Sequence, residues 1–236
     1  MVRSIQNEGI GGDRHVKDDG KQVAPRFSFL GGAMPLDFCN TVDWHSSDAP
    51  TDRLRGYEDV VLWAVAAGVA SEDAGNAMIW AARSSPAEAE AVFAEARSLR
   101  ETAFRLFTAE AHGKAPAPAD VAALNAAWTD ASSQLVLTYT EDGYAWKWRD
   151  EIREAATAAL RQPLYAVARA AVELLLSPQA RHIRRCEGPP GCGWLFLDAS
   201  KNRSRRWCSM QDCGNREKMR RYQQRKKESR GSGRAP

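Results

Sequence analysis

The sequence predicts a mainly α-helical N-terminal domain with a small β-hairpin, which makes it an α+β domain, and a small C-terminal module of a hairpin and a helix. Three observations carry this prediction. Apolar residues recur at helical spacing through residues 85–112, and polar and apolar residues alternate through residues 134–148. Four of the five cysteines fall close together near the C-terminus. A length of 236 residues suits one or two domains.

The N-terminal segment is polar and has no apolar core of the kind that a signal peptide needs. We therefore predict a disordered leader over residues 1–25 and a cytoplasmic protein.

The run FSFLGGAMPLDFCNTVDW then suggests a short strand, a glycine turn and the start of a helix. Residues 54–69 are expected to form a helix behind a cap at Thr51 or Asp52, and residues 73–83 a shorter one.

The clearest helix is expected over residues 85–112. Ser85 can cap its N-terminus, Pro86 suits the first helical position, and Glu88 completes a capping box. Gly113 follows the expected end. One face of this helix is apolar at helical spacing and is predicted to be buried; its residues are Val92, Ala96, Leu99, Ala103, Leu106 and Phe107.

A hairpin is expected between two further groups of helices. After the break GKAPAPAD, a helix is marked by Val121, Leu124 and Trp128. The run QLVLTYTEDGYAWKW alternates in polarity, and its Asp142-Gly143 pair is a hairpin signal. Residues 149–161 and 164–176 then favour helices, and the second is apolar nearly all round, which predicts burial.

Charge divides the chain near residue 180. The first 180 residues hold 17 basic and 25 acidic side chains, whereas the remainder holds 16 basic and 5 acidic ones. An acidic body with a basic tail is typical of a polyanion-binding module joined to another domain. No run of about 18 uncharged apolar residues exists, so no membrane partner is expected. We place the helical domain at residues 26–178.

The clustered cysteines form two pairs, Cys186 with Cys192 and Cys208 with Cys213. In a chain without a secretion signal such clusters favour metal over disulfides. A zinc ion takes four thiolates in a tetrahedron, and two closely spaced pairs supply them, so we predict one structural Zn²⁺. Iron–sulfur ligation is the alternative. A catalytic zinc is disfavoured because four protein ligands leave no open coordination position for water or substrate. The fifth cysteine, Cys39, lies outside the cluster and is interpreted as a buried thiol.

The local pattern predicts how the zinc module is built. Between the cysteine pairs, GWLFLD suits a strand, ASKNRS a turn and RRWC a returning partner strand. Trp194, Phe196 and Trp207 are the expected miniature core. A helix is expected to begin near Cys213, which gives the layout of a treble clef. The zinc module is placed at residues 179–228, with a flexible tail over residues 229–236.

The basic residues of this module predict nucleic-acid binding, because each phosphate contact releases counterions. Asparagine, glutamine and arginine also read base edges in a major groove. The predicted DNA-binding residues lie on the expected hairpin and final helix: Lys201, Arg203, Arg205, Arg206, Asn215, Arg216, Lys218, Arg220, Arg221 and Arg225. Met219 and Tyr222 are expected to pack back onto the hairpin.

Other functions remain open at this point. The same basic surface would suit RNA, and the zinc module could instead dock another protein. A nuclease is disfavoured, because a treble-clef nuclease needs histidines on the finger and no histidine follows His182. We therefore expect no enzyme and no catalytic residues.

The run CEGPPGCGWLFLDASKNRSRRWCSMQDCGNREKMRRY closely resembles the CGNR zinc-finger family, whose name matches Cys213 to Arg216 here. Upstream, LDFCNTVDW, ETAFRLFTAEAHGKAPAPADVAALNAAW and LLLSPQARHIRRC resemble the ABATE domain that usually precedes this finger. The resemblance covers about residues 27–225. It implies a transcription regulator whose finger binds DNA through one zinc ion, with the four cysteines as ligands, and whose front domain senses a small molecule.

Four polar side chains near one helix start are the candidate effector-binding residues: Asp37, Asn40, Thr41 and His45. Helix capping by Asp37 or Asn40 is the structural alternative. The predicted partners are thus DNA, which would place the protein at the nucleoid, a small-molecule effector and a second copy in a homodimer.

Overall fold

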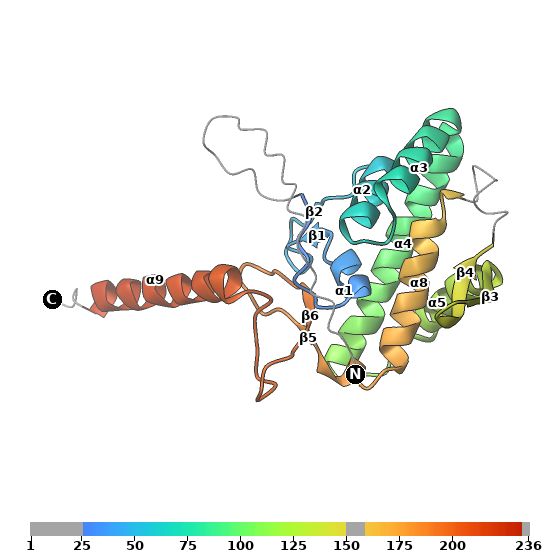
Figure 1. Ribbon diagram of the computed structural model, residues 1–236. Helices are drawn as coiled ribbons and strands as arrows, with labels where there is room; N and C mark the ends of the chain where they lie inside the picture. Colours follow the sequence, from blue (N-terminus) through green and yellow to red (C-terminus); the bar gives the residue numbers. More distant parts are fainter. Residues whose placement is uncertain (1–25, 150–158, 233–236) are drawn as a thin grey trace, which may run out of the picture.

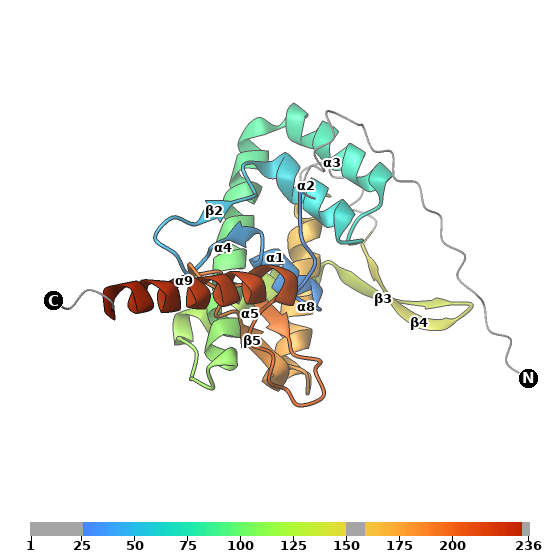
Figure 2. The same cartoon turned by 90° about the vertical axis from the view of Figure 1, so that its left-hand side faces the viewer.

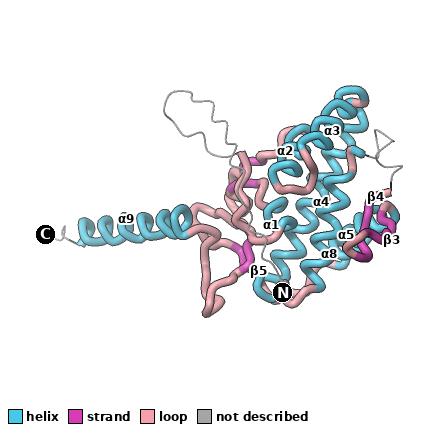
Figure 3. Tube along the Cα trace, in the orientation of Figure 1, coloured by secondary structure: helices cyan, strands magenta, loops and turns pink. Residues whose placement is uncertain are grey.

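The structure, a computed structural model, describes residues 26–149 and 159–232. The predicted leader and most of the helix expected over 149–161 lie outside the described residues. Figure 1 shows a helical body, a smaller region of strands and loops on one side of it, and one long helix that leads away from that region. Figure 3 shows that helices dominate and that every strand is short, as the sequence predicts.

The longest described helix, α4 (Pro86–Ala111), runs through the middle of the body. Its predicted apolar face is confirmed, because all six of the residues named above are buried. The predicted capping box is wrong: the Ser85 side chain makes no cap hydrogen bond, and the Glu88 carboxylate instead accepts a 2.6 Å hydrogen bond from Arg161. Gly113 follows the helix end with a positive φ of 62°, as glycine at this position permits.

The helices that pack around α4 and form the main core with it include α2 (Tyr57–Ala66), α3 (Glu72–Ser84) and α8 (Gln162–Leu176). Helix α2 begins behind Gly56, so the predicted cap at Thr51 or Asp52 is wrong. Asp52 instead binds the buried Arg100 guanidinium through two 2.7 Å hydrogen bonds. None of the described helices combines the length and the apolar character that crossing a bilayer requires.

The predicted hairpin is confirmed. Helix α5 (Pro118–Ser133) leads into strand β3 (Leu135–Thr140), and β4 (Gly143–Trp148) returns antiparallel to it. The turn consists of Glu141 and Asp142, and Gly143, with a φ of 109°, begins β4 opposite Thr140. Figure 2 shows this hairpin running outward from the helices.

The segment before α2 differs from the prediction. The expected strand within FSFLGG does not form; helix α1 (Met34–Cys39) is followed by a two-stranded pair, β1 (Val42–Asp43) and β2 (Thr51–Asp52). Arg100 also donates to the Thr41 hydroxyl over 3.2 Å, and so ties the start of this pair to α4. Cys39 is fully buried, as predicted.

The C-terminal region starts with a short turn of helix, η1 (Ala180–His182), and strands β5 (Ile183–Arg185) and β6 (Leu195–Leu197). It continues through the single turn η2 (Met210–Gly214) into α9 (Asn215–Ser232). The hairpin and helix are confirmed, but the predicted strand pairing is wrong. Strand β6 pairs with β5 instead of with the run RRWC.

That difference has a physical reason in Asp198. Its buried carboxylate accepts from the Ser200 N–H over 2.9 Å and from the Arg205 N–H over 3.0 Å. The N–H of Arg205 is therefore directed to a side chain instead of a β-ladder. Burial pushes the pKa of Asp198 upward, but the hydrogen bonds from Ser200 and Arg205 outweigh it, so the pKa lies below its ordinary value.

Candidate metal centre and basic helix

The first cysteine pair lies on the turn that joins β5 to β6. Cys186 follows β5 directly, and its N–H donates to the Trp194 carbonyl over 2.8 Å, so the antiparallel pairing continues to the first thiol. Glycine is required within the turn, because a Cβ on Gly188 would lie 2.6 Å from the Sγ of Cys213. The turn therefore brings the two thiols together and leaves room for the second pair.

The second pair lies at the start of the final helix. Cys208 ends the loop that Asp198 organises, and Cys213 lies in η2. The Ser209 hydroxyl accepts from the Asp212 N–H over 3.1 Å and caps this turn. Because η2 runs straight into α9, the second thiol pair also fixes the base of that helix.

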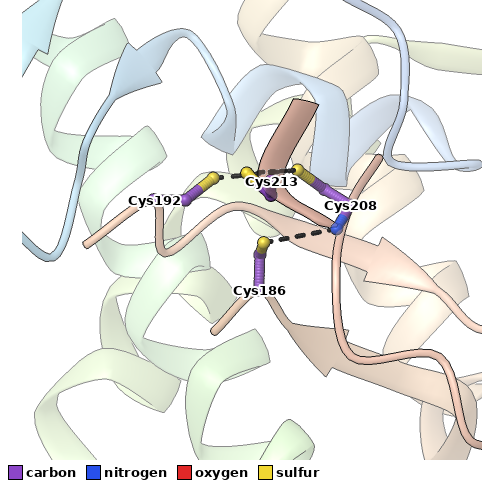
Figure 4. Close-up of side chains that lie close together, drawn as sticks. All are labelled: Cys186, Cys192, Cys208 and Cys213. Atoms are coloured by element: carbon purple, nitrogen blue, oxygen red, sulfur yellow. Dashed lines mark hydrogen bonds between the residues drawn. The ribbon is translucent and has the colours of Figure 1, made fainter. Parts of the chain in front are cut away.

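All four thiols are buried and converge on one point. Their Sγ atoms lie within 4.8 Å of one another, and none of the cysteines forms a disulfide. Figure 4 shows the four sulfur atoms turned toward a shared centre. Cys208 Sγ lies 3.7 Å from the Sγ atoms of both Cys192 and Cys213. A zinc tetrahedron with bonds of about 2.3 Å has sulfur–sulfur edges of about 3.8 Å, so the donor set fits zinc.

Two backbone N–H groups favour the thiolate form of Cys186. Cys186 Sγ accepts from the N–H of Gly188 over 3.4 Å and from the N–H of Cys208 over 3.3 Å. Hydrogen bonds from the other three thiols, that of Cys192 first, lower the pKa of Cys186, whereas the hydrogen bond with Cys186 is the main cause that raises the pKa of Cys192 and of Cys208. Trp194, Phe196 and Trp207 pack in this cluster, which confirms the expected miniature core, and Trp44 of the body packs there as well.

This C-terminal region is fused to the helical body. Both amide atoms of the buried Asn40 bind the backbone of Leu195: Nδ2 donates to the carbonyl over 2.8 Å, and Oδ1 accepts from the N–H over 2.8 Å. The Trp194 indole donates to the Val42 carbonyl over 2.8 Å. Ile183 and Leu195 also belong to the main hydrophobic core. The thiol cluster therefore does not lie on a separately tethered module.

The backbone of the body also reaches the turn between the first two thiols. The N–H of His45 donates to the Cys192 carbonyl over 3.1 Å, and the N–H of Ser46 donates to the Gly191 carbonyl over 3.0 Å. A Cβ on Gly193 would lie 2.0 Å from the Ser46 hydroxyl oxygen, so only glycine permits this approach. Each of these contacts joins the segment after α1 to the metal-binding turn.

The four predicted effector-binding residues all have partners within the chain. Asn40 makes the contacts above, and Asp37 accepts from the Gly31 N–H over 2.7 Å. Burial raises the pKa of Asp37 to about 6, and the Gly31 hydrogen bond lowers it in part. Thr41 donates to the Phe38 carbonyl over 2.8 Å, while the His45 ring lies 3.0 Å from Glu101 and stacks on Phe104. Effector binding at these residues stays a prediction.

A cavity of about 270 Å³ lies elsewhere in the body, between α4, α5 and α8. Leu99 and Leu164 contribute apolar surface to it, and Thr102, Asp130 and Tyr165 contribute polar groups. Burial, and the neighbouring Asp130 to a smaller degree, raise the pKa of Tyr165 to about 12, so the phenol is neutral at pH 7. The sequence pattern contains no signal for this cavity, because its lining comes from three separate helices.

Several predicted DNA-binding arginines are held by intramolecular contacts. Arg205 stacks on the Phe196 ring at 4.5 Å, and its side chain donates to the Trp207 carbonyl over 2.8 Å. Arg206 binds Glu187 over 2.8 Å, and Arg203 donates to the Asp198 carbonyl. These contacts stabilise the loop before Cys208, so the three arginines have a structural role in addition to any role at a nucleic-acid surface.

At the start of α9, Glu217 binds two of the predicted arginines. Its carboxylate accepts from Arg220 over 2.8 Å and from Arg221 over 2.6 Å. The hydrogen bond from Arg220, followed by that from Arg221, lowers the pKa of Glu217 to about 2. The Arg216 guanidinium lies 4.4 Å over the ring of Trp44, a residue with a positive φ of 55°. The base of α9 is thus anchored to the body by a cation–π contact.

Beyond its base, α9 stands clear of the body, as Figure 1 shows. Every described side chain from Lys218 to Glu228 is exposed. Met219 and Tyr222 are each 56% exposed, so the predicted packing of these two residues onto the hairpin is wrong. Lys201, Lys218 and Arg225 are also exposed, and Asn215 donates to the Gln211 carbonyl over 2.8 Å.

The sequence analysis missed two arginines near the cluster. Arg184 and Arg185 lie on β5 and line an open groove together with Arg220 and His112. Arg185 also lies 5.5 Å over the Phe104 ring of the body. Their proximity to Arg220 depends on the pairing of β5 with β6, which the sequence analysis assigned to other residues.

The comparisons with known proteins agree with this arrangement. A model of the ABATE family, described as "Putative stress-induced transcription regulator", matches residues 32–178. A model of the CGNR zinc finger matches residues 182–226. No curated protein matches the chain. Both matched families are regulator or zinc-finger types and not enzyme families. Because the first match covers more than half of the sequence, the chain belongs to the ABATE family and carries a CGNR zinc finger after its helical domain.

Proposed function

We propose that the protein is a zinc-dependent, DNA-binding transcription regulator of the cytoplasm, acting at nucleoid DNA. The observation that carries this proposal is the position of α9, which projects from the thiol cluster with every described side chain from Lys218 onward exposed. Because these side chains are exposed, the cations of the helix remain available to another partner. A polyanion is the partner that its cations favour.

Zinc would be held by the four thiolates of Cys186, Cys192, Cys208 and Cys213. Bound there, the ion supplies folding free energy of about 10–16 kcal/mol, as in zinc-finger peptides, and no catalysis, because four protein ligands close its coordination sphere. The ion would affect function by fixing the position of α9 relative to the body. The ion joins the β5–β6 turn, which is bonded to the body, to η2, which begins α9.

Helix α9 would enter the major groove, which is wide enough to admit one α-helix. Lys218, Arg225 and Lys201 are proposed to contact phosphates, and Asn215 is proposed to contact base edges. The remaining predicted arginines would contribute through their charge while they keep their intramolecular partners. The cavity between α4, α5 and α8 supports the proposal that the front domain binds a small effector.

The proposal is tested by selecting bound sequences from a random duplex pool and measuring the affinity of the selected site by fluorescence anisotropy. Lys218→Ala and Arg225→Ala should each weaken binding about 3–10-fold and reduce the salt slope by about one. Arg55→Ala removes an exposed cation of the body and is the matched control. A chelator should abolish binding.

Three results would contradict the proposal. Tighter binding to a matched RNA would indicate an RNA-associated module. Failure to bind any nucleic acid at about 100 mM salt would indicate a protein-docking module. An equal loss of affinity in Arg55→Ala would show that the overall charge of the chain, and not α9, determines binding.

A further inference from the structure

The β3–β4 hairpin carries an uncovered apolar face. Leu137 pairs with Trp146 and Tyr139 with Tyr144, and directly opposite residues of an antiparallel pair point to the same side of the sheet. These four side chains are between 57% and 77% exposed. The two tyrosine rings contact each other edge-on, with centroids 5.2 Å apart. At its base this face meets the body, where the Trp148 ring lies 6.0 Å from that of Tyr165.

The opposite face of the hairpin has the composition expected of a water-exposed surface. Its outer half presents Thr138, Thr140 and Ala145, and Lys147 lies beside Val136 nearer the base. The hairpin therefore has a distinct polar face and a distinct apolar face, and the apolar one has no helix packed over its outer half in the described chain. A two-stranded hairpin is marginally stable alone and usually requires a covered apolar face. An occupant for this face is therefore expected.

The exposed area is sufficient for an interface between two copies of the chain. Aromatic side chains expose roughly 150–250 Å² each when uncovered, so the four exposed side chains offer about 600 Å² per copy. Two such faces in contact would bury about 1,200 Å², which is the lower end of specific interfaces. A second copy supplies matching area and matching aromatic chemistry without any further partner.

We propose that this face is a homodimer interface in which two hairpins pack against each other about a two-fold axis. The four central side chains carry no charge, so the same patch on both copies can be self-complementary. The ends of the hairpin differ in sign: exposed Glu141 and Asp142 form the tip, and exposed Arg149 follows the base. Antiparallel packing places the acidic tip of one copy beside Arg149 of the other, whereas parallel packing would bring like charges together.

The test is sedimentation velocity of the full, zinc-loaded chain between about 1 and 100 µM. The wild-type chain should form a dimer. Tyr144→Lys should raise the dissociation constant of that dimer at least tenfold, because a lysine on the apolar face places a charge in the interface. Ala145→Lys is the matched control, since it adds the same charge one residue further on, to the opposite face of the same strand. It should leave the dissociation constant within about threefold of wild type.

A second pair of variants separates a lost interface from a lost fold. Tyr144→Phe keeps the ring and should keep the dimer. Arg149→Glu should weaken the dimer, and combining it with Glu141→Arg and Asp142→Arg should restore the dimer.

A monomeric wild-type chain would overturn the proposal, as would a dimer that Tyr144→Lys leaves intact. Loss of the far-ultraviolet circular dichroism of the helices in Tyr144→Lys, but not in Ala145→Lys, would also overturn it, because the tyrosine would then serve the fold of a single copy.

Discussion

At the scale of single residues, the side chain of Asn40 joins the body to the finger. Its side chain satisfies both backbone groups of Leu195, a residue 155 positions further along the chain. In doing so it imitates a neighbouring β-strand at the edge of β6. Both partners are fully or almost fully buried, so water cannot replace the amide if it is removed.

Asn40→Ala is expected to lower the free energy of unfolding by about 2–4 kcal/mol, since it leaves one buried N–H and one buried carbonyl without partners. Urea denaturation followed by circular dichroism measures this change. Asn125→Ala, which removes an exposed amide on α5, is the control and should change the stability by less than about 0.5 kcal/mol. Equal effects of the two substitutions would show that the Leu195 contact contributes little.

The comparison of Asn40 with the cysteines explains how much of the candidate site the sequence predicts. Four thiols in two close pairs indicate metal binding, because few other kinds of site use that pattern. The fold brings these four thiols together. An asparagine near a helix end is compatible with a cap, a ligand or a long-range contact. Its partner Leu195 is an ordinary strand residue, and no local pattern connects the two. The body-to-finger contacts could therefore not be predicted.

At the scale of elements, α9 combines a fixed base with an exposed shaft. Isolated helices of this length are marginal in water, and packing usually supplies what their propensity does not. Here the stabilising features gather at the base: Cys213 precedes the helix, Arg216 lies over Trp44, and Glu217 places negative charge in the first turn. The helical pattern of the fold was predictable element by element, but the direction of α9 was not, since it depends on Trp44 of the body.

Glu217→Gln should raise the affinity for duplex DNA about threefold or more if the proposed function is correct. The substitution removes a carboxylate that neutralises Arg220 and Arg221, so both guanidinium groups become available to phosphates. Fluorescence anisotropy at several salt concentrations measures the change.

Glu228→Gln is the matched control for this prediction. It removes one negative charge from the exposed end of the same helix. If both variants raised the affinity equally, net charge would explain the effect and the pairing at Glu217 would not. A weaker affinity in Glu217→Gln would instead show that Glu217 holds the two arginines in the productive position.

At the scale of the whole molecule, the strands of the finger contribute to the main hydrophobic core of the body. Ile183 and Leu195 of the finger strands are fully buried within the cluster that also contains Val92 and Phe107 of α4. Backbone contacts from His45 and Ser46 add to this shared core. Unfolding the finger would therefore expose apolar surface of the body, so the two regions are expected to unfold together.

Removing zinc should therefore destabilise the helical body as well as the finger. With a chelator, or in Cys208→Ser, thermal unfolding followed at 222 nm is expected to remain a single transition with its midpoint lowered by 10 °C or more, since loss of several kcal/mol shifts the midpoint by roughly that amount. Cys39→Ser, which alters the buried thiol outside the cluster, should not change the zinc content. Two separate transitions, with the helical one unmoved, would contradict the shared core.

The bonds between Asn40, Val42, His45 and the strand regions of the finger bear on protein engineering. A transplant of residues 179–228 alone into a foreign host would leave behind the side chains and carbonyls that complete it. A chimera that also imported residues 31–46 would retain them. The exchangeable unit in this chain is thus discontinuous, and a recombination point at residue 178 would cut through it.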